Sequence, residues 1–379
     1  MKKRIIAIAA VTALLAALLS CPALAEGVQP GDRFRFGHFE QDMFSANGPD
    51  PIVWRVLDTD DGTGLVLAVS EMGLYTMVYH HNNNETAWGD TDVRAWLNSA
   101  FAGTFSEDEL QQVAVTRVSG SDDRFFLLDS DQITRYLREP YLCYATPRAL
   151  KEEKPGAYVN EETGGSSWLV RTDTAKKRIA WVGGGGALYS PTGKRGINYL
   201  NTNDNVVRPA MWIRKEACTD IITDYTVPLY ALTEMRLSTC SGPSTGFSGL
   251  GDYFDDNGGE PVRVLSRVND GSIWWLEIEF EYNGLLVRCY TGEKRIRVPI
   301  SKVPDDRAGF LYNASVTRDG TAYYGPGTLY KQMPERLTPA AGTAGCVVKE
   351  ENDWCCFEFP GEDNLTYRVW LPADALSAG

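Results

Sequence analysis

The same β-strand sequence motif occurs twice in the chain. "SIWWLEIEFEYNG" (272–284) and "NDWCCFEFPGED" (352–363) align without a gap when Trp275 is placed on Trp354. The flanking words recur in the same order: "GPSTGF" (242–247) corresponds to "GPGTLY" (325–330), and "RCY" (288–290) corresponds to "RVW" (368–370). The spacings differ by only a few residues, which indicates an internal duplication of about 70 residues.

The repeated phrase alternates between two kinds of side chain. In the first copy Trp274, Leu276 and Ile278 share one face, while Glu277 and Glu279 share the other. This period of two predicts a half-buried antiparallel strand, and the Asn-Gly pair that follows it favours a hairpin turn. Short strand patterns alternate with turn residues throughout both copies, so we expect two small all-β domains, at 224–303 and 308–379.

Both copies resemble the bacterial SH3-like barrel. The stretch "MRLSTCSGPSTGFSGLG" (235–251) carries the resemblance most clearly, and "TAYYGPGTLY" (321–330) carries it more loosely. The resemblance implies a protein outside the cell that binds peptidoglycan or short peptides. The closing segments "RCYTGEKRI" and "RVWLPADAL" lack the Gly-Trp pair usual in that family, which leaves the ligand open. Trp275, Trp354 and Trp370 either line a ligand groove in these domains or belong to their cores.

The first 25 residues predict a secretory signal peptide. Lys2 to Arg4 are basic, Ile5 to Leu19 are apolar, and small residues end the segment. We therefore expect an extracytoplasmic protein, either secreted or associated with the cell surface. The stretch around Cys21 also resembles a lipobox, which would place a lipid anchor on that cysteine. No later segment has the roughly 20 apolar residues of a transmembrane helix.

Charge and cysteine content exclude several classes of partner. The formal net charge is −13, and such an acidic chain is a poor match for nucleic acid, whose phosphates are bound by Lys and Arg. Seven of the cysteines lie beyond the leader without a paired C-x-x-C spacing, so zinc bound by cysteines is not expected. An odd number leaves at least one thiol unpaired. Cys346 and Cys355 could meet across a hairpin.

The block at 26–215 reads as strands, a few short helices, and then strands joined by long loops. Capping residues mark the helices: Thr91 or Asp90 begins the helix that runs to Phe101. Ser106 with Glu109, and Asp129 with Gln132, have the spacing of capping boxes. This mixture predicts the α+β class for the block.

Four ordered words in this block resemble an uncharacterised secreted domain family of Gram-positive bacteria. They are "VRAWLNSAF", "RFFLLD", "SSWLVRT" and "VVRPAMWI", and they cover nearly all of Tyr75 to Ile213. That family itself resembles the C-type-lectin-like fold, which formylglycine-generating enzymes share. The expected architecture is therefore α+β overall, with an N-terminal C-type-lectin-like mixed domain followed by two all-β SH3-like barrels.

Few residues of the front block suggest a site. Asn203 and Asp204 precede the last strand of the block, where they either bind calcium through oxygen ligands or form an ordinary turn. Arg171 and Arg208 lie in strands, where they either pair with acids or line a carboxylate-binding pocket. His80 and His81 are adjacent and should point apart along an extended chain, which favours a solvated loop over a metal site.

No catalytic motif with recognisable flanks is present, and we expect no catalytic residues, no cofactor and no bound metal. The sequence predicts a non-catalytic binding or adaptor protein. Its SH3-like repeats would attach to the cell wall or a surface polymer, and its front domain would present a ligand-binding face for peptidoglycan, a surface glycan or a peptide. The alternative is an enzyme or protein-modifying factor that uses the front domain.

Overall fold

The computed structural model describes residues 27–42, 44, 46–151, 156–194, 196–361 and 364–379. The fold is mostly β, with 41% of residues in strands and 14% in helices, so the expected α+β class, with its C-type-lectin-like mixed domain, is wrong. The helices of the front block are too short to form a layer of their own. The longest described α-helix, α4 (Ser130–Tyr136), has seven residues.

The caps predicted for these helices are confirmed. Ser106 and Glu109 form a capping box, as do Asp129 and Gln132, and the Thr91 side chain accepts a hydrogen bond from the backbone N–H of Arg94. The described helical segments of the front block are η1 (Trp88–Asp90), α2 (Asp92–Trp96), η2 (Leu97–Phe101), η3 (Ala102–Thr104), α3 (Glu107–Gln112), α4, α5 (Pro147–Lys151) and η4 (Lys215–Ala217).

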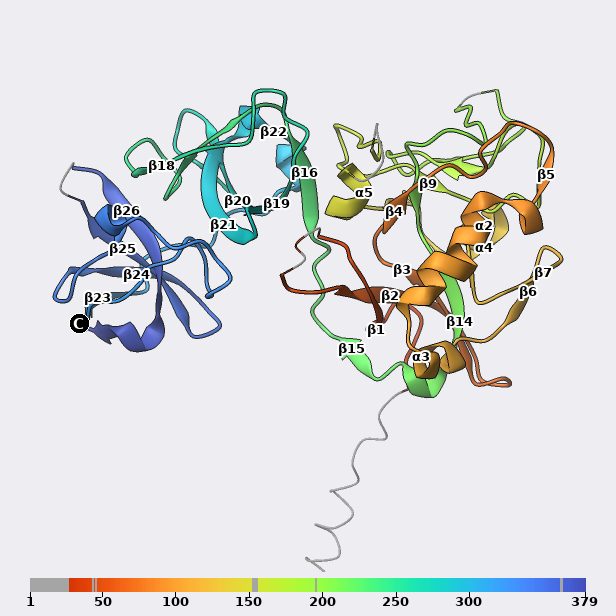
Figure 1. The fold of residues 1–379 in the computed structure, drawn as a ribbon, viewed down its shortest axis with the longest axis horizontal. Helices are drawn as coiled ribbons and strands as arrows, with labels where there is room; N and C mark the ends of the chain where they lie inside the picture. The colour runs from red at the N-terminus through yellow and green to blue at the C-terminus, as the bar shows by residue number, and fades with distance from the viewer. Residues whose placement is uncertain (1–26, 43, 45, 152–155, 195, 362–363) are drawn as a thin grey trace, which may run out of the picture.

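A six-stranded antiparallel sheet forms the base of the front block (Figure 1). Its strands in spatial order are β15 (Asp220–Ile222), β1 (Arg33–Phe39), β2 (Asp50–Asp60), β3 (Leu65–Ser70), β14 (Ala210–Arg214) and β8 (Phe125–Phe126). Trp54 on β2 is fully buried and packs near Phe125 on β8, with the ring centroids 6.3 Å apart. The apolar core of the front block therefore lies against this sheet.

A second sheet of two-residue strands lies beside the first. In spatial order it contains β12 (Leu188–Tyr189), β11 (Trp181–Val182), β9 (Trp168–Leu169), β13 (Val206–Val207) and β4 (Tyr75–Thr76), and β13 runs parallel to β9. Two ribbons complete the block: β5 (Thr86–Ala87) with β10 (Thr174–Ala175), and β6 (Thr116–Val118) with β7 (Ser121–Asp123). Because these strands are so short, loops carry much of the surface.

The two copies of the repeat each form an antiparallel sheet, in teal and blue in Figure 1. The first has the order β18 (Gly249–Tyr253), β17 (Leu237–Cys240), β21 (Leu285–Gly292), β20 (Trp274–Tyr282), β19 (Pro261–Asn269), β16 (Leu229–Thr233) and β22 (Ile296–Arg297). The second has the order β26 (Thr366–Pro372), β25 (Trp354–Pro360), β24 (Ala344–Glu351), β23 (Tyr312–Val316) and β27 (Leu376–Ala378). Their helical turns are η5 (Glu293–Arg295), η6 (Ile300–Lys302), η7 (Glu335–Leu337) and η8 (Ala373–Ala375).

Strand register is the same in the two copies. Glu279 pairs with Arg288 across the first central hairpin, and Glu358 pairs with Arg368 across the second. The preceding strand is interrupted at the corresponding point in each copy, between Val264 and Ser266 in one and between Val347 and Lys349 in the other. The repeated words in the sequence therefore occupy equivalent places in the two sheets.

The repeated arginine of the first copy is buried against the second copy. The Arg288 guanidinium binds Glu279 of its own hairpin through Nε (3.0 Å) and Nη2 (2.8 Å), and it donates to Glu351 of the second copy at 2.7 Å. It also lies 5.5 Å from the ring centroids of both Tyr330 and Trp370. Cation–π contacts of this kind strengthen when water is excluded, and Arg288 is only 8% exposed.

The equivalent arginine of the second copy makes the reciprocal contact. Arg368 binds Glu358 of its own hairpin through Nε at 2.7 Å. It lies 5.1 Å from the ring centroid of Phe247 and 5.2 Å from that of Tyr290, both in the first copy, and it donates to the Tyr290 hydroxyl at 2.7 Å. Phe247 and Tyr290 are the sequence equivalents of Tyr330 and Trp370. Each copy therefore inserts its arginine between the same two aromatic positions of the other.

Backbone hydrogen bonds repeat this exchange. The N–H of Leu286 donates to Leu329 at 3.0 Å, and the N–H of the equivalent Thr366 donates to Gly246 at 2.9 Å. We call this contact, built from Arg288, Arg368 and their four aromatic neighbours, the reciprocal interface. The repeated sequence motifs, at 242–247 with 325–330 and at 288–290 with 368–370, thus hold the two sheets together.

The glycine of each repeated Gly-Pro motif leaves the space that the aromatic side chain of the same motif needs. A Cβ atom on Gly325 would lie 2.2 Å from the Tyr330 ring, and one on Gly242 would lie 2.3 Å from the Phe247 ring. The aromatic side chain therefore folds back onto its own glycine and becomes one wall of the arginine slot.

We predict that Gly325→Ala lowers the free energy of unfolding by about 1–3 kcal/mol, the usual cost of overfilling a packed site. The added methyl group would push Tyr330 out of the slot around Arg288. Gly327→Ala is the matched control, because its Cβ would meet the nearest Tyr330 carbon at an ordinary 3.6 Å. Urea unfolding of both variants measures the difference; equal stability of the two would show that the glycine space is unimportant.

The hairpin of the second copy does not bring Cys346 and Cys355 together. Cys346 lies opposite Glu358, whereas Cys355 lies opposite Glu350. The seven cysteines of the described residues are all free thiols. The leader with Cys21 lies outside the described residues, and within them no helix has the length and apolar character needed to span a bilayer.

Candidate functional site

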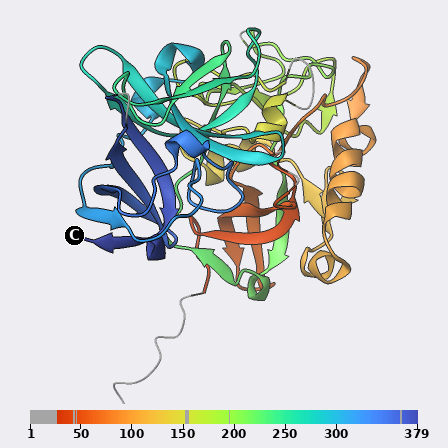
Figure 2. The ribbon, with the colours of Figure 1, turned by 60° about the vertical axis from the view of Figure 1, so that its left-hand side comes forward.

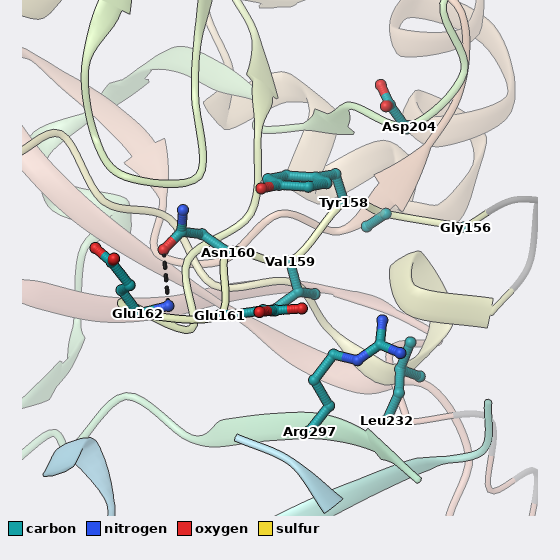
Figure 3. Close-up of a pocket in the computed structure, with 10 residues that line it drawn as sticks. Gly156, Tyr158, Val159, Asn160, Glu161, Glu162, Asp204, Leu232 and Arg297 are labelled. Atoms are coloured by element: carbon teal, nitrogen blue, oxygen red, sulfur yellow. Dashed lines mark hydrogen bonds between the residues drawn. The ribbon is translucent and has the colours of Figure 1, made fainter. Parts of the chain in front are cut away.

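A cleft of about 540 Å³ opens between the front block and the first copy (Figure 3). The front block contributes the loop from Gly156 to Glu162 together with Asp204, and the first copy contributes Leu232 on β16 and Arg297 on β22. We call it the acidic cleft, because Glu161, Glu162 and Asp204 line it beside a single arginine. It includes Asp204, one of the residues singled out from the sequence.

The ring of Tyr158 stands in the middle of the acidic cleft and is 49% exposed (Figure 3). The Tyr158 N–H donates to the Asp204 carbonyl at 2.9 Å, which fixes the loop against the segment before β13. Asn160 then forms a turn, since its Oδ1 accepts from the N–H groups of Glu162 and Thr163, each at 3.0 Å. The ring is therefore held on an ordered loop rather than on a strand.

Negative charge exceeds positive charge in the acidic cleft. Arg297 donates from Nη2 to Glu234 at 3.1 Å, so that its charge is already partly neutralised. Glu161 lies on the same side of the Tyr158 ring as Arg297, whereas the Asp204 carboxylate lies on the other side and points away (Figure 3). Burial raises the pKa of Asp204. The arrangement suits a neutral or positively charged ligand with an apolar face for the ring.

Arg208 belongs to a buried charge cluster in the front block. Glu71 is 4% exposed, and it accepts from Arg55 Nε at 2.8 Å and lies 3.3 Å from Arg33 Nε. The Arg208 guanidinium donates to the carbonyls of Ser70 (2.8 Å) and Glu71 (3.5 Å). Burial lowers the pKa of Arg208. The Glu71 carboxylate contacts Arg55 and Arg33, and its charge also acts on Arg208.

A second cavity, of about 340 Å³, borders this cluster. Arg55, Arg138 and Arg208 line it with Tyr136 and Tyr141, and no carboxylate is among its lining residues in the described part of the chain. In a chain with a net charge of −13, this local excess of positive charge is the reverse of the average surface. The chemistry of the cavity suits a small anion. It corresponds to the carboxylate-binding pocket that is one of the two sequence-based interpretations of Arg208.

The remaining sequence candidates are distributed over the molecule. Arg171 is buried, forms an ion pair with Asp129, and donates to the Leu127 carbonyl at 3.2 Å, so it ties two segments of the front block together. Asn203 adjoins the acidic cleft but is not among its lining residues. In the described structure Asp204 does not belong to a group of three or more His, Cys, Asp or Glu side chains that could hold a metal ion.

The three tryptophans of the repeat that the sequence singles out as ligand candidates have different surroundings. Trp275 is 6% exposed and donates to Asp270 at 2.8 Å, and Trp370 is 4% exposed within the reciprocal interface. Trp354 is half-buried, packs edge-on against Tyr323, and borders two surface hollows. Of the three, Trp354 offers the most surface to a ligand.

Sequence patterns missed the central residues of the acidic cleft. Tyr158, Glu161 and Arg297 stand in a loop or at the end of a strand, where no periodicity identifies them. The polar run from Asn160 to Thr163 indicates a turn, but it does not reveal that Arg297, over 130 positions later, faces that turn. Only the packing of the first copy against the front block brings them together.

Comparison with known proteins gives one match. The model of a family described as a domain of unknown function (DUF6273) matches residues 63–215, which is less than half of the chain. The matched range contains Arg171, Asp204 and Arg208 but neither copy of the repeat. No curated protein and no solved structure matches the chain. The resemblance of the two copies to SH3-like domains stays a prediction.

We predict that Glu71→Gln destabilises the protein by about 3 kcal/mol at pH 7. It leaves the half-buried Arg33 and Arg55 without the carboxylate that they share, and it removes the negative charge near the buried Arg208. Burial alone would raise the pKa of Glu71, but Arg55, Arg208 and Arg33 outweigh it and hold the pKa below its usual 4.5. A lowered folded-state pKa contributes stability above pH 4.5 that is lost as pH falls further.

Chemical unfolding between pH 7 and pH 3 measures both effects. The variant should lose less stability than the wild type over the acid range, since it lacks the titrating group. Glu216→Gln serves as the control, because the Glu216 side chain is 69% exposed. A Glu71→Gln protein as stable as the wild type would contradict the cluster's role.

Proposed function

We propose that this chain is a non-catalytic extracytoplasmic binding protein whose acidic cleft holds a neutral or amine-bearing glycan of the bacterial surface. The observation that carries the proposal is the exposed Tyr158 ring, surrounded by carboxylate and amide groups on a fixed loop. Ligand sites combine apolar or aromatic surface with a few placed polar groups. A sugar ring matches both, with its C–H face on the tyrosine and its hydroxyl groups towards Asn160 and Glu161.

The charges of the cleft define which glycans fit. Three carboxylates and one arginine line it, and that arginine is already bonded to Glu234. A uronic acid or phosphate polymer would meet repulsion, whereas an amino sugar would gain attraction. We therefore expect the cleft to prefer amine-bearing and neutral sugars over acidic ones.

Binding rather than cleavage is supported by the placement of the acids. Glycoside hydrolysis requires two carboxyl groups on either side of one scissile bond, at a defined separation. In the acidic cleft the Asp204 carboxylate, whose pKa burial raises, points away from Glu161 across the Tyr158 ring (Figure 3). The alternative of an enzyme therefore has less support than a binding protein.

We predict that Tyr158→Ala weakens binding of a glucosamine oligomer at least about tenfold, the effect expected when a central aromatic contact worth about 1.4 kcal/mol or more is lost. Calorimetric titration of the full chain with glucosamine, N-acetylglucosamine and galacturonic acid oligomers measures the preference. Tyr199→Ala is the matched control: Tyr199 is 44% exposed and lies outside the cleft.

Two outcomes would contradict this proposal. Equal binding by the Tyr158→Ala and Tyr199→Ala proteins would remove the cleft from recognition, and tighter binding of the galacturonic acid oligomer would contradict the charge argument. Release of shorter sugars during the titration would identify an enzyme instead.

The two copies would add attachment to the cell wall, as their SH3-like resemblance implies. Trp354 and Tyr323 line a hollow of about 310 Å³ together with Pro339 and Pro372, a setting in which an aromatic edge is accessible to a polymer. The hollow adjoins the reciprocal interface, because Tyr323 and Trp354 pack against the cluster that contains Trp370, but none of the four aromatic residues around Arg288 and Arg368 is among its lining residues in the described structure.

We predict that the full chain co-sediments with purified peptidoglycan sacculi, and that Trp354→Ala reduces the bound fraction several-fold because the aromatic wall of the hollow is lost. Trp181→Ala gives a comparison, since Trp181 is a partly buried tryptophan of the front block that stacks on Tyr189. If sacculi retain neither the wild type nor the variant, the copies do not bind peptidoglycan.

A further inference from the structure

Two histidines and one aspartate converge beside the helix that begins at Asp92. His80 and His81 follow β4, and Asp92 is the first residue of α2. The His81 N–H donates to Asp92 Oδ2 at 2.7 Å, while the His80 N–H donates to the Leu200 carbonyl at 2.9 Å. The first contact ties the His81 backbone to the Asp92 carboxylate, and the second holds the His80 backbone against Leu200.

Both imidazole rings face Asp92. His80 Nδ1 lies 3.2 Å from Asp92 Oδ1, and His81 Nδ1 lies 2.9 Å from Asp92 Oδ2. The ring centroids are 4.2 Å apart. Adjacent residues point apart in an extended strand, but this segment is irregular, and the sequence argument against convergence therefore does not apply.

The spacing matches the ligand shell of a transition metal. Potential ligand atoms of the three side chains all lie within 4.8 Å of one another. Zinc binds imidazole nitrogen and carboxylate oxygen at roughly 2.0–2.2 Å, so tetrahedral ligands stand about 3.3 Å apart. The separation of His80 Nδ1 from Asp92 Oδ1 is close to that value.

The state of His80 is an independent observation. The residue is 8% exposed, and its buried Nδ1 makes no hydrogen bond within the described structure, although Asp92 Oδ1 lies 3.2 Å away. A buried polar atom without a hydrogen bond is energetically unfavourable. A cation between His80 Nδ1 and Asp92 Oδ1 would satisfy both atoms at once, since each would direct a lone pair at it.

We propose that His80, His81 and Asp92 bind one divalent transition-metal ion of the zinc type. Imidazole ligands favour zinc and its neighbours over calcium or magnesium, which prefer oxygen. Three protein ligands leave a fourth position open, and His81, with 67% of its side chain exposed, places that position at the surface. None of the three residues lines the acidic cleft, so the site is separate from the glycan proposal.

Asn82 completes the surroundings of the site. Its amide lies 2.9 Å from Nε2 of His81. If Nδ1 binds the metal, Nε2 carries the proton, and the Asn82 amide oxygen can accept it once the amide group turns over. Such partners of metal-binding histidines orient the ring and raise metal affinity.

Zinc titration of the untagged full chain tests the site, with a competing chromophoric chelator as the readout. The wild type should bind one Zn²⁺ at micromolar concentration or tighter. His81→Ala and Asp92→Asn should each weaken binding at least about a hundredfold, since loss of a supporting partner alone costs 10–100-fold. Co²⁺ should give visible absorption bands in the wild type that both variants lose.

The chain supplies its own control. It has three histidines, and the third, His38, is exposed and outside the group, so His38→Ala should bind zinc like the wild type. His81 is a surface residue, so its variant should keep the wild-type circular dichroism spectrum. The proposal is overturned by wild-type binding weaker than about 1 mM, or by binding that survives both His81→Ala and Asp92→Asn.

Discussion

Two buried arginines determine how the C-terminal half of the molecule is organised. Arg288 and Arg368 each pair with a glutamate of their own hairpin and enter a slot between two aromatic rings of the other copy. A guanidinium removed from water is tolerated only when it is paired and fully hydrogen-bonded. The slots therefore fix one relative position of the two copies, whose sheets lie side by side (Figure 2). Buried residues of both copies form one apolar core.

This arrangement has a consequence for recognition. The aromatic residues of the repeat that seemed available for a ligand groove are largely committed to the reciprocal interface, with Trp370 4% exposed. Surface that a ligand can reach lies elsewhere: on Trp354 in the second copy, and in the acidic cleft where the first copy meets the front block. The first copy thus supplies Arg297 to a site whose other residues come largely from a separate part of the chain.

Sequence reasoning succeeded where the relevant residues are close neighbours. The capping boxes of Ser106 and Asp129 involve residues three positions apart, and the alternation from Trp274 to Tyr282 is a property of one strand. It failed where the outcome depends on tertiary packing. The short helices suggest an α+β fold, yet strands hold 41% of the residues and helices only 14%, and β9 and β13 are only two residues long. Such strands leave no periodic pattern. His80 and His81 were placed on an extended chain, whereas an irregular segment turns both rings to Asp92.

We propose that ligands bind in the acidic cleft, whereas the reciprocal interface is structural. Hydrogen exchange followed by mass spectrometry, with and without a glucosamine oligomer, tests both parts at once. The account predicts slower exchange in the loop at 156–162 and near Arg297 on ligand addition, with unchanged exchange in β21 and β26. Protection confined to β21 and β26, with none in the loop, would contradict it.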